Sequence, residues 1–227
     1  MDKFTRSDLP NRTAFPIASA GYALIIAAAF VTAVLALLGL TTLTLIALVI
    51  TFCICGFFRD PDRIIPAEKG IVVSPADGKV ILADTIDNGP FVSGQAMKIS
   101  IFMSVFNVHV NRIPYDGRVK EIEYYPGKFF SANLDKASLQ NEHNAVFVEM
   151  DNSKPLCVVQ VAGLIARRII CNIQPGDHVL RGQRFGLICF GSRLDVYLPP
   201  DIKLRVAVGD KVKAGTSILG QFALKKD

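Results

Sequence analysis

The stretch that most constrains the structure of this chain carries no charge: between Thr13 and Phe58 there is no Asp, Glu, Lys or Arg. A transmembrane helix needs about 20 apolar residues to cross a hydrocarbon core about 30 Å thick. Ile17–Leu37 supplies one such span and Leu43–Phe58 a second, shorter one, with a tight reversal between them. We therefore expect a membrane-anchoring helical hairpin over residues 1–58. One long tilted helix is the alternative.

Basic residues flank this apolar stretch on both sides. Lys3, Arg6 and Arg12 precede it, and Arg59, Arg63 and Lys69 follow it. Positive charge at both ends favours both ends on the cytoplasmic side, so we expect the rest of the chain at the cytoplasmic face of the cell membrane. A cleaved signal peptide is not expected, because its apolar core has only about 7–15 residues. The net charge of +5 indicates attraction to anionic lipid rather than to nucleic acid.

Residues 59–227 have a different pattern, in which short runs rich in Val and Ile alternate with glycine and proline. Closely spaced runs of this kind predict a mainly β domain of sandwich or barrel character. The polar stretch Phe129–Asn144 lacks a clear period and is expected to be a loop. The predicted strands are Ile71–Ser74, Lys79–Ala83, Met97–Met103, Arg118–Tyr124, Ala145–Met150, Leu156–Val161, Leu164–Asn172, Arg184–Phe190, Leu194–Leu198 and Lys203–Val208.

One short pattern occurs twice in the second half of this domain. Gly176-Asp177-His178-Val179 returns thirty-three residues later as Gly209-Asp210-Lys211-Val212. Glycine supplies a positive φ, and aspartate can hydrogen-bond its own turn. Such paired turns resemble those of lipoyl and biotinyl carrier domains, but neither copy has the exposed lysine tip that a carrier modifies. The repeat therefore predicts a feature of the fold and not a function.

The five cysteines and three histidines show no metal-ligand pattern. No Cys-x-x-Cys occurs, and His109, His143 and His178 lack zinc-ligand spacing to the cysteines. We expect buried, reduced thiols and no metal site.

Two segments that are typical of turns sit next to predicted strands. Ser74-Pro75-Ala76-Asp77-Gly78 follows one strand, and Gly191-Ser192 separates two others. Proline, aspartate and glycine all form turns, and a Gly-Ser pair between strands is usually a turn as well. Neither segment indicates a function by itself.

A third segment, Phe106–Pro114, combines polar and apolar residues. Asn107, His109 and Asn111 alternate with valines, which places three polar groups on one face if the segment is extended. A lone histidine at a strand end is more often structural than catalytic, but three polar groups on one face suit a lined site.

Taken together and in order, these segments resemble the phosphatidylserine decarboxylase family, in its short bacterial and archaeal-type branch. The matching segments follow the N-terminal hairpin: Phe57-Phe58-Arg59-Asp60-Pro61, Ser74-Pro75-Ala76-Asp77-Gly78, Asn107-Val108-His109-Val110-Asn111-Arg112 with Pro114, Asn141-Glu142-His143-Asn144, Val161-Ala162-Gly163 and Phe190-Gly191-Ser192. The resemblance covers nearly the whole chain.

The resemblance implies a self-processing decarboxylase. Ser192 would attack the carbonyl of Gly191, cut the chain into residues 1–191 and 192–227, and become a pyruvoyl group that forms a Schiff base with the substrate. Asp77, His109 and Ser192 would form a protease-like triad, and His109 would protonate the substrate carbon. The substrate would be phosphatidylserine and the product phosphatidylethanolamine. No external cofactor is implied.

The sequence departs from the family pattern at positions that could bind substrate. The family also has a long branch. Arg112 stands where the long branch has a second histidine, and Arg193 stands where it has threonine. His143 stands where the family often has arginine. All three are candidates for binding the substrate. Phe129, Phe130 and Leu134 are expected either to dip into the lipid surface or to cover part of the core.

Two other functions remain open at this point. The lipid could be archaetidylserine or another serine phospholipid, or the chain could be a membrane-tethered β adaptor without catalysis. On the main interpretation its partners are a phospholipid, the membrane and the other cleavage product in a heterodimer, and no nucleic acid.

Overall fold

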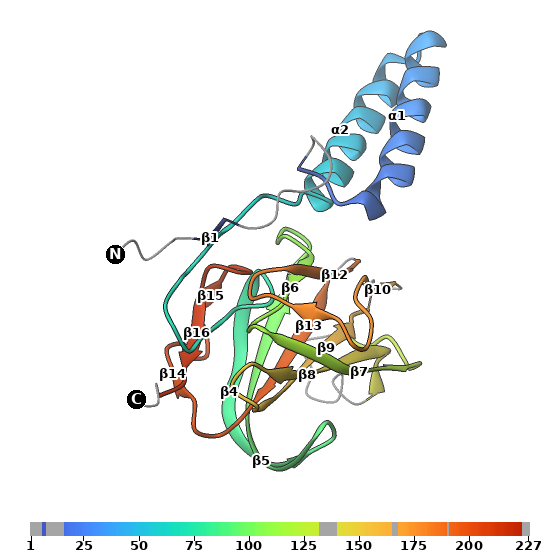
Figure 1. The fold of residues 1–227 in the computed structure, drawn as a ribbon. Helices are drawn as coiled ribbons and strands as arrows, with labels where there is room; N and C mark the ends of the chain where they lie inside the picture. Colours follow the sequence, from blue (N-terminus) through green and yellow to red (C-terminus); the bar gives the residue numbers. More distant parts are fainter. Residues whose placement is uncertain (1–5, 8–15, 132–139, 165–167, 190, 224–227) are drawn as a thin grey trace. The chain divides into compact units, whose positions relative to one another are not determined.

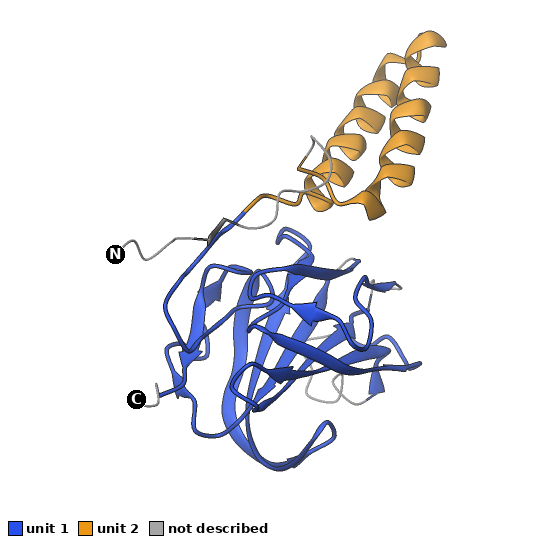
Figure 2. Cartoon of the chain, in the orientation of Figure 1, with its two compact units in different colours: residues 1–9, 63–227 blue, residues 10–62 orange. Residues whose placement is uncertain are grey.

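The structure is a computed structural model that describes residues 6–7, 16–131, 140–164, 168–189 and 191–223 (Figure 1). The chain divides into two compact units (Figure 2). One comprises residues 10–62, and the other comprises residues 1–9 and 63–227. Leu134, for which a lipid or core contact was expected, lies outside the described residues.

The smaller unit is a pair of helices. Helix α1 spans Tyr22–Leu37 and follows the short 3-10 helix η1 (Ser19–Gly21), and helix α2 spans Thr41–Phe57. Gly39, with φ +71°, lies in the reversal between them. The helical stretch Ser19–Leu37 is long and apolar enough to cross a membrane, whereas α2 is shorter. The predicted helices and reversal are therefore present, and one long helix is excluded.

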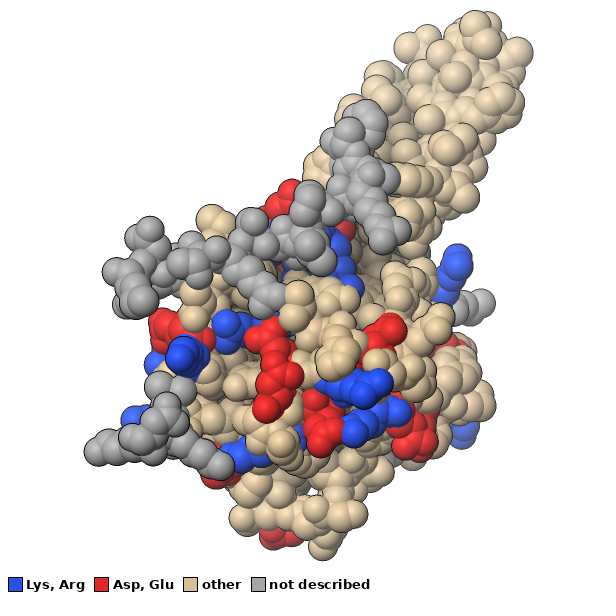
Figure 3. Space-filling model, viewed as in Figure 1, with Lys and Arg blue, Asp and Glu red and all other residues tan. Residues whose placement is uncertain are grey.

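The surface of this pair of helices is apolar. Leu37 and Phe52 are 88% and 69% exposed, and Figure 3 shows no charged side chain along the helices on the visible face. Two of its hydroxyl groups are satisfied within the helices: Thr32 and Thr51 each donate to a carbonyl one turn back, and their oxygens lie 3.1 Å apart between α1 and α2. Such internal pairing suits a hydrocarbon surrounding, where exposed polar groups find no partner.

The larger unit is built from antiparallel strands (Figure 1). Its main sheet has eight strands in the order β11-β7-β8-β9-β13-β5-β4-β15, and two three-stranded sheets have the orders β10-β12-β6 and β14-β16-β3. The bounds are β1 (Arg6–Ser7), β2 (Ile64–Ile65), β3 (Ile71–Val73), β4 (Gly78–Gly89), β5 (Val92–Met103), β6 (Val110–Arg112), β7 (Gly117–Tyr125), β8 (His143–Met150), β9 (Pro155–Ala162), β10 (Ile169–Cys171), β11 (His178–Val179), β12 (Arg184–Ile188), β13 (Ser192–Leu198), β14 (Lys203–Leu204), β15 (Lys211–Val212) and β16 (Ile218–Gln221).

The main core lies on one face of the eight-stranded sheet, which we call the inner face. Alternate residues of the central strands supply it, such as Ile101 of β5 and Val196 of β13, and they pack with Val72 of β3 and Phe185 of β12 from the small sheets. A smaller cluster around Tyr197 covers the opposite, outer face. The mainly β, sandwich-like domain expected from the sequence is confirmed.

The strands differ from the expected ones in several places. Of the expected strands Leu164–Asn172 and Lys203–Val208, the described residues form only β10 (Ile169–Cys171) and β14 (Lys203–Leu204). Strands β4 and β5 continue as a long hairpin to Gly89 and Val92, beyond the apolar runs, because the ladder of backbone hydrogen bonds does not require apolar side chains. In the segment expected to be extended from Asn107 to Asn111, strand β6 begins only at Val110. The expectation of three polar groups on one strand face was therefore wrong.

The repeated glycine turns are confirmed. Gly176 and Gly209 have φ of +96° and +103°. Asp177 accepts a hydrogen bond from the N–H of Gln174 at 2.8 Å, and Asp210 accepts one from the N–H of Ala207 at 2.9 Å. Each aspartate thus closes its own turn, as the residue type predicts.

Candidate active site

Strand register brings the sequence-predicted segments to one edge of the large sheet. Ser192 is the first residue of β13, and it pairs with Met103 at the end of β5 and with Ala162 at the end of β9. Strand β4 lies beside β5, with Lys79 opposite Phe102, so Asp77 leaves the sheet at the same edge. Four neighbouring strands therefore contribute to one site.

Ser192 is fully buried, and its side chain lies on the inner face. Its hydroxyl donates a hydrogen bond to the thioether sulfur of Met103 at 3.4 Å. Gly191 has φ +66°, and a Cβ added there would meet no atom within 4 Å. The space is open, so backbone conformation is what favours glycine here. The bond before Ser192 is thus held in a bent conformation that other residues rarely adopt.

A chain of buried amides leads to the same sulfur. Asn144 donates to Gln160 at 3.0 Å, and Gln160 donates to Asn111 at 2.9 Å. Because the oxygen of Asn111 is occupied by this bond, its amide group turns toward Met103, with Nδ2 3.8 Å from the sulfur. The chain thus ends on the sulfur that also accepts the hydroxyl of Ser192.

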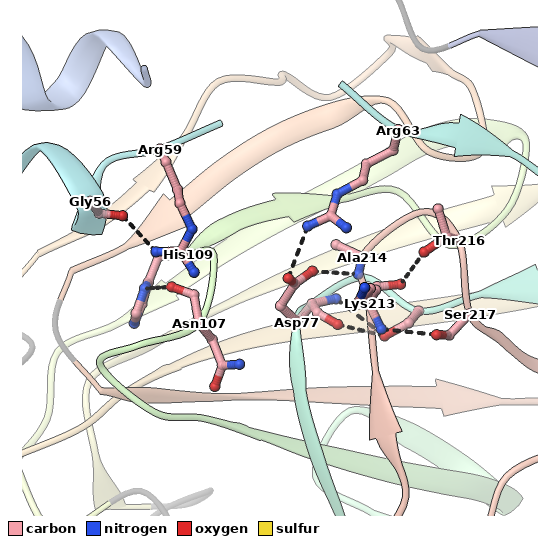
Figure 4. A network of polar contacts seen from close by, with 12 residues as sticks. Gly56, Arg59, Arg63, Asp77, Asn107, His109, Lys213, Ala214, Thr216 and Ser217 are labelled. Atoms are coloured by element: carbon pink, nitrogen blue, oxygen red, sulfur yellow. Dashed lines mark hydrogen bonds and ion pairs between the residues drawn. The ribbon is translucent and has the colours of Figure 1, made fainter. Parts of the chain in front are cut away.

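His109 lies just before β6 and is fully buried. Its Nδ1 is 2.9 Å from the backbone oxygen of Asn107 (Figure 4). A carbonyl oxygen only accepts, so Nδ1 carries the proton of the neutral ring, and Nε2 is the nitrogen that can take up another proton. The imidazole therefore has the tautomer that a general base requires.

Both oxygens of Asp77 have partners. Oδ1 accepts the N–H of Ala214 at 2.7 Å, and Oδ2 pairs with Arg63 at 2.9 Å. Figure 4 shows these bonds and the separate bond between His109 and Asn107. Among the described residues neither oxygen of Asp77 is bonded to His109. The backbone of Asn107, rather than Asp77, thus orients the imidazole in this state.

A second aspartate occupies a position equivalent to that of Asp77. Pro114-Tyr115-Asp116-Gly117 precedes β7 as Pro75-Ala76-Asp77-Gly78 precedes β4. Asp116 accepts the N–H of Arg181 at 2.8 Å, as Asp77 accepts that of Ala214 at 2.7 Å. The two halves of the domain thus repeat the same aspartate contact. Asp77 in addition lies beside the Ser192 edge, where it pairs with Arg63.

Arg193 points to the face of the sheet opposite Ser192. Successive residues of a strand alternate between faces. The guanidinium of Arg193 is buried, 2.6 Å from Asp195 and 2.9 Å from the hydroxyl of Ser100. Asp195 also lies 3.5 Å from Lys98. Arg193 is thus part of a buried charge cluster on the outer face and is not brought together with Ser192.

His143 also lies on the outer face. Its Nδ1 is 2.6 Å from the backbone oxygen of Asn141, and its ring stacks on Tyr125 with centroids 4.7 Å apart. Phe91 meets the same ring edge-on at 5.4 Å. These contacts describe a structural histidine in an aromatic cluster.

Arg112 holds backbone segments together near Asp77. Its side chain is buried and donates to the carbonyl of Gly182 at 2.9 Å, while its own N–H donates to the carbonyl of Pro75 at 2.9 Å. Its backbone thus touches the Ser74–Gly78 segment that contains Asp77.

The loop after β7 is tied to the site edge by Asn141. The side chain of Asn141 bonds both backbone groups of Phe130 and the carbonyl of Ala162, at 2.7–2.9 Å. Phe129 packs on Ala162 and Ile188. Of the two expectations for this loop, core cover is thus the one met by Phe129.

The thiols match the expectation in part. All five cysteines are free, and Cys157 is buried, but Cys53 is exposed on α2. Burial raises the pKa of the Cys157, Cys171 and Cys189 thiols, which keeps them protonated.

Three residues of the site were not singled out from the sequence: Met103, Gln160 and Arg63. Gln160 could have been found from the sequence, because it is the one polar residue in the apolar stretch Leu156–Ala162. Met103 could not, since an inward methionine on a strand is ordinary core. Arg63 lies in a linker with no period.

Comparison with known proteins shows the family of this chain. The family model for phosphatidylserine decarboxylase matches residues 50–220. The chain belongs to the phosphatidylserine decarboxylase family. It is 50% identical over 207 residues to the "Phosphatidylserine decarboxylase proenzyme" of Desulfotalea psychrophila, covering 91% of this chain and 97% of the relative. It is also 51% identical over 195 residues to the protein of that name from Syntrophus aciditrophicus, covering 81% and 92%.

Proposed function

We propose that this chain is a membrane-bound proenzyme that cuts itself between Gly191 and Ser192 and then decarboxylates phosphatidylserine to phosphatidylethanolamine. The observation that carries the proposal is a buried serine, hydrogen-bonded to a weakly accepting sulfur, directly after a glycine with φ +66°. The proenzyme names of relatives about 50% identical support it.

Self-cleavage begins when Ser192 Oγ attacks the carbonyl carbon of Gly191 and the C–N bond breaks, which leaves an ester and a free amine. Removal of the α-proton of residue 192 then expels the Gly191 carboxylate. The resulting dehydroalanine takes up water and releases ammonia, which leaves a pyruvoyl group. Serine is a weak nucleophile and needs a base. His109 fits this role, because its Nδ1 is held by Asn107 and its Nε2 is the basic nitrogen.

Asp77 enters this scheme in a less direct way. Its Oδ2 pairs with Arg63 at 2.9 Å, and the backbone of Asn107 already orients His109. Asp77 acts on the imidazole only if this ion pair opens. We therefore propose Asp77 as a positioning residue of the precursor.

The residues around position 192 fit a pyruvoyl group, which is no larger than the serine it replaces and carries a keto oxygen where serine has its backbone nitrogen. The amide of Asn111, fixed by Gln160, is a buried donor directed at the sulfur of Met103, which also bonds Ser192. A pyruvoyl group, when formed, supplies an electron sink for the pair left as carbon dioxide departs. His109 then delivers a proton to the substrate carbon.

The two products of cleavage are expected to stay together as a heterodimer. Strand β13 pairs with β5 along its whole length and with β9 from Ser192 to Tyr197. In addition β15 and β16 of residues 192–227 pair with β4 and β3 of residues 1–191. Separation would break all of these ladders.

The membrane assignment rests on the helix pair. We propose that residues 1–58 anchor the chain and that residues 59–227 form the catalytic domain at the cytoplasmic face of the cell membrane. Ser19–Leu37 is long enough to span, and the basic flanks favour this orientation.

Mass spectrometry of the purified protein tests the proposal. We expect two fragments, the smaller starting with pyruvate at position 192, and phosphatidylethanolamine formed from phosphatidylserine. Ser192→Ala is expected to leave one intact, inactive chain, whereas Ser93→Ala, an exposed serine on β5, is expected to be processed normally. A single intact chain in the unmodified protein contradicts the proposal.

His109→Ala is expected to lower either processing or turnover by about 10²–10⁴-fold, the usual contribution of a general acid or base. Rates near those of the unmodified protein in both assays remove His109 from the mechanism.

A further inference from the structure

We propose that Val105, Phe106 and Leu164 form an apolar lip at the edge of the Ser192 site, and that this lip enters the interface of an anionic lipid bilayer. The proposal rests on the proposed function and adds to it how the domain meets its lipid substrate.

The three side chains of the apolar lip are unusually exposed. Phe106 is 82%, Leu164 63% and Val105 40% exposed, although Phe, Leu and Val are among the residues most often buried. Exposed apolar side chains that cluster at one place mark interaction surfaces.

Strand register places the lip at the site. Val105 and Phe106 follow Met103, and Leu164 follows Ala162, and Met103 and Ala162 are the residues that pair with Ser192. Neighbouring strands lie about 4.8 Å apart, so the two parts of the lip leave the sheet about 10 Å apart, one on each side of β13.

A hydrogen-bonded turn holds Phe106 in its exposed position. Asn107 Oδ1 accepts the N–H of Ser104 at 2.9 Å and its hydroxyl at 2.8 Å, and the N–H of Asn107 donates to the carbonyl of Ser104 at 3.0 Å. These bonds hold the turn that carries Val105 and Phe106. The backbone oxygen of Asn107 also bonds His109, so one residue positions both the lip and the imidazole.

Basic side chains stand on the same edge. Lys128 and Arg168 are exposed. The carbonyl of Arg168 accepts the N–H of Cys189, close to Gly191. Lys128 forms a bridge with Asn141, which bonds the carbonyl of Ala162. Aromatic and aliphatic side chains flanked by basic ones are typical of surfaces that bind anionic lipid headgroups.

A bilayer suits the position of the lip better than a protein partner does. A protein seated on the edge where Ser192 lies would cover the site. A lipid surface there instead brings the serine headgroup to residue 192 while the acyl chains stay in the membrane.

The chain contains no tryptophan, so one introduced at the lip reports its own surroundings. We expect the emission of Phe106→Trp, in full-length protein reconstituted into vesicles of phosphatidylcholine and phosphatidylglycerol, to be quenched when the phosphatidylcholine is brominated in its acyl chains. The control is Pro200→Trp, an exposed turn residue past the other end of β13, which is expected to keep its emission. Absence of quenching at position 106, or equal quenching at both positions, overturns the proposal.

Kinetics give a second test. For each protein we compare the turnover of phosphatidylserine in vesicles with the turnover of monomeric short-chain phosphatidylserine. In the double variant Val105→Ser/Phe106→Ser the ratio of these two rates is expected to fall about tenfold or more. An equal loss on both substrates contradicts a docking role. If the unmodified protein is neither cut nor active, the proposed function fails, and the quenching experiment still decides whether the lip meets lipid.

Discussion

The hydroxyl of Ser192 is hydrogen-bonded to the sulfur of Met103, at 3.4 Å, in the fully buried edge of the large sheet. A thioether is a weak acceptor. It holds the direction of the hydroxyl without competing strongly for the proton that a base must remove. In the proposed self-cleavage, Met103 would therefore orient the serine and leave it reactive.

Replacing Met103 by leucine keeps the volume and removes the acceptor. A typical hydrogen bond contributes about 0.5–1.5 kcal/mol, and one to sulfur lies at the low end, so we expect self-cleavage to slow by about two- to fivefold. Met97→Leu is the matched control, because Met97 lies on the same face of β5 but opposite Leu198, at the far end of β13. The rate is measured by following the precursor after synthesis. Equal rates for the two variants would show that the sulfur plays no part.

Gln160→Leu interrupts the buried amide chain. It leaves the oxygen of Asn111 and the amide of Asn144 without their bonds to Gln160. Each buried group that loses its partner costs about 1–3 kcal/mol. We expect a clear drop in the free energy of unfolding, measured with urea, together with slower processing. Gln95→Leu, at an exposed residue of the β4–β5 hairpin, should change the free energy by less than about 0.5 kcal/mol.

Asp77 and Asp116 offer a comparison within one chain. Asparagine keeps the oxygen that accepts the N–H of Ala214 or Arg181 and removes the charge. If Asp77 serves the mechanism, Asp77→Asn lowers the rate of self-cleavage at least about tenfold, and Asp116→Asn leaves it unchanged. Normal cleavage in both variants would reduce Asp77 to a turn residue. The fragments on a denaturing gel give the answer.

The buried thiol of Cys157 is expected to make the folded state less stable at alkaline pH. Burial raises the pKa of this thiol above its ordinary value in the folded state. Below the unfolded-state pKa of about 8.5 both states are protonated, so the folded state loses nothing. As the pH rises above that value, only the unfolded state ionises, and the folded state loses stability. We expect the thermal midpoint to fall from about pH 8.5 upward, and Cys157→Ala to fall less steeply over the same range. Parallel curves would contradict this.

The sequence predicts the helix pair and most strand centres for a clear physical reason. A stretch without charge and runs of Val and Ile are local signals. Local signals can be interpreted without knowing which strands pair with each other. The place of β13 between β5 and β9 depends on register between segments far apart in the chain, which no single run encodes. The Ser192–Met103 contact and the amide chain through Gln160 depend on that register and were therefore not predicted.

The outer-face position of Arg193 shows how one boundary alters a site. The predicted strand began at Leu194, which left Arg193 in a turn beside Ser192 and free to point with it. In the structure β13 begins at Ser192, and alternation then sends Arg193 to the other face. The prediction for Asn107 was wrong for the opposite reason, because a strand was expected where the structure has a turn. The side chain of Asn107 closes that turn instead of lining a strand.

The position of Ser192 as the first residue of β13 has a consequence for the bond before it. That bond lies just outside the ladder, so no strand pairing is interrupted when it breaks. The domain can thus change its covalent connectivity and keep its architecture, and the new chain end forms where the sheet already stops. A cut anywhere inside β13 would instead split the central strand. If the chain is cut as proposed, the fold confines an irreversible backbone reaction to a place where it does no structural damage.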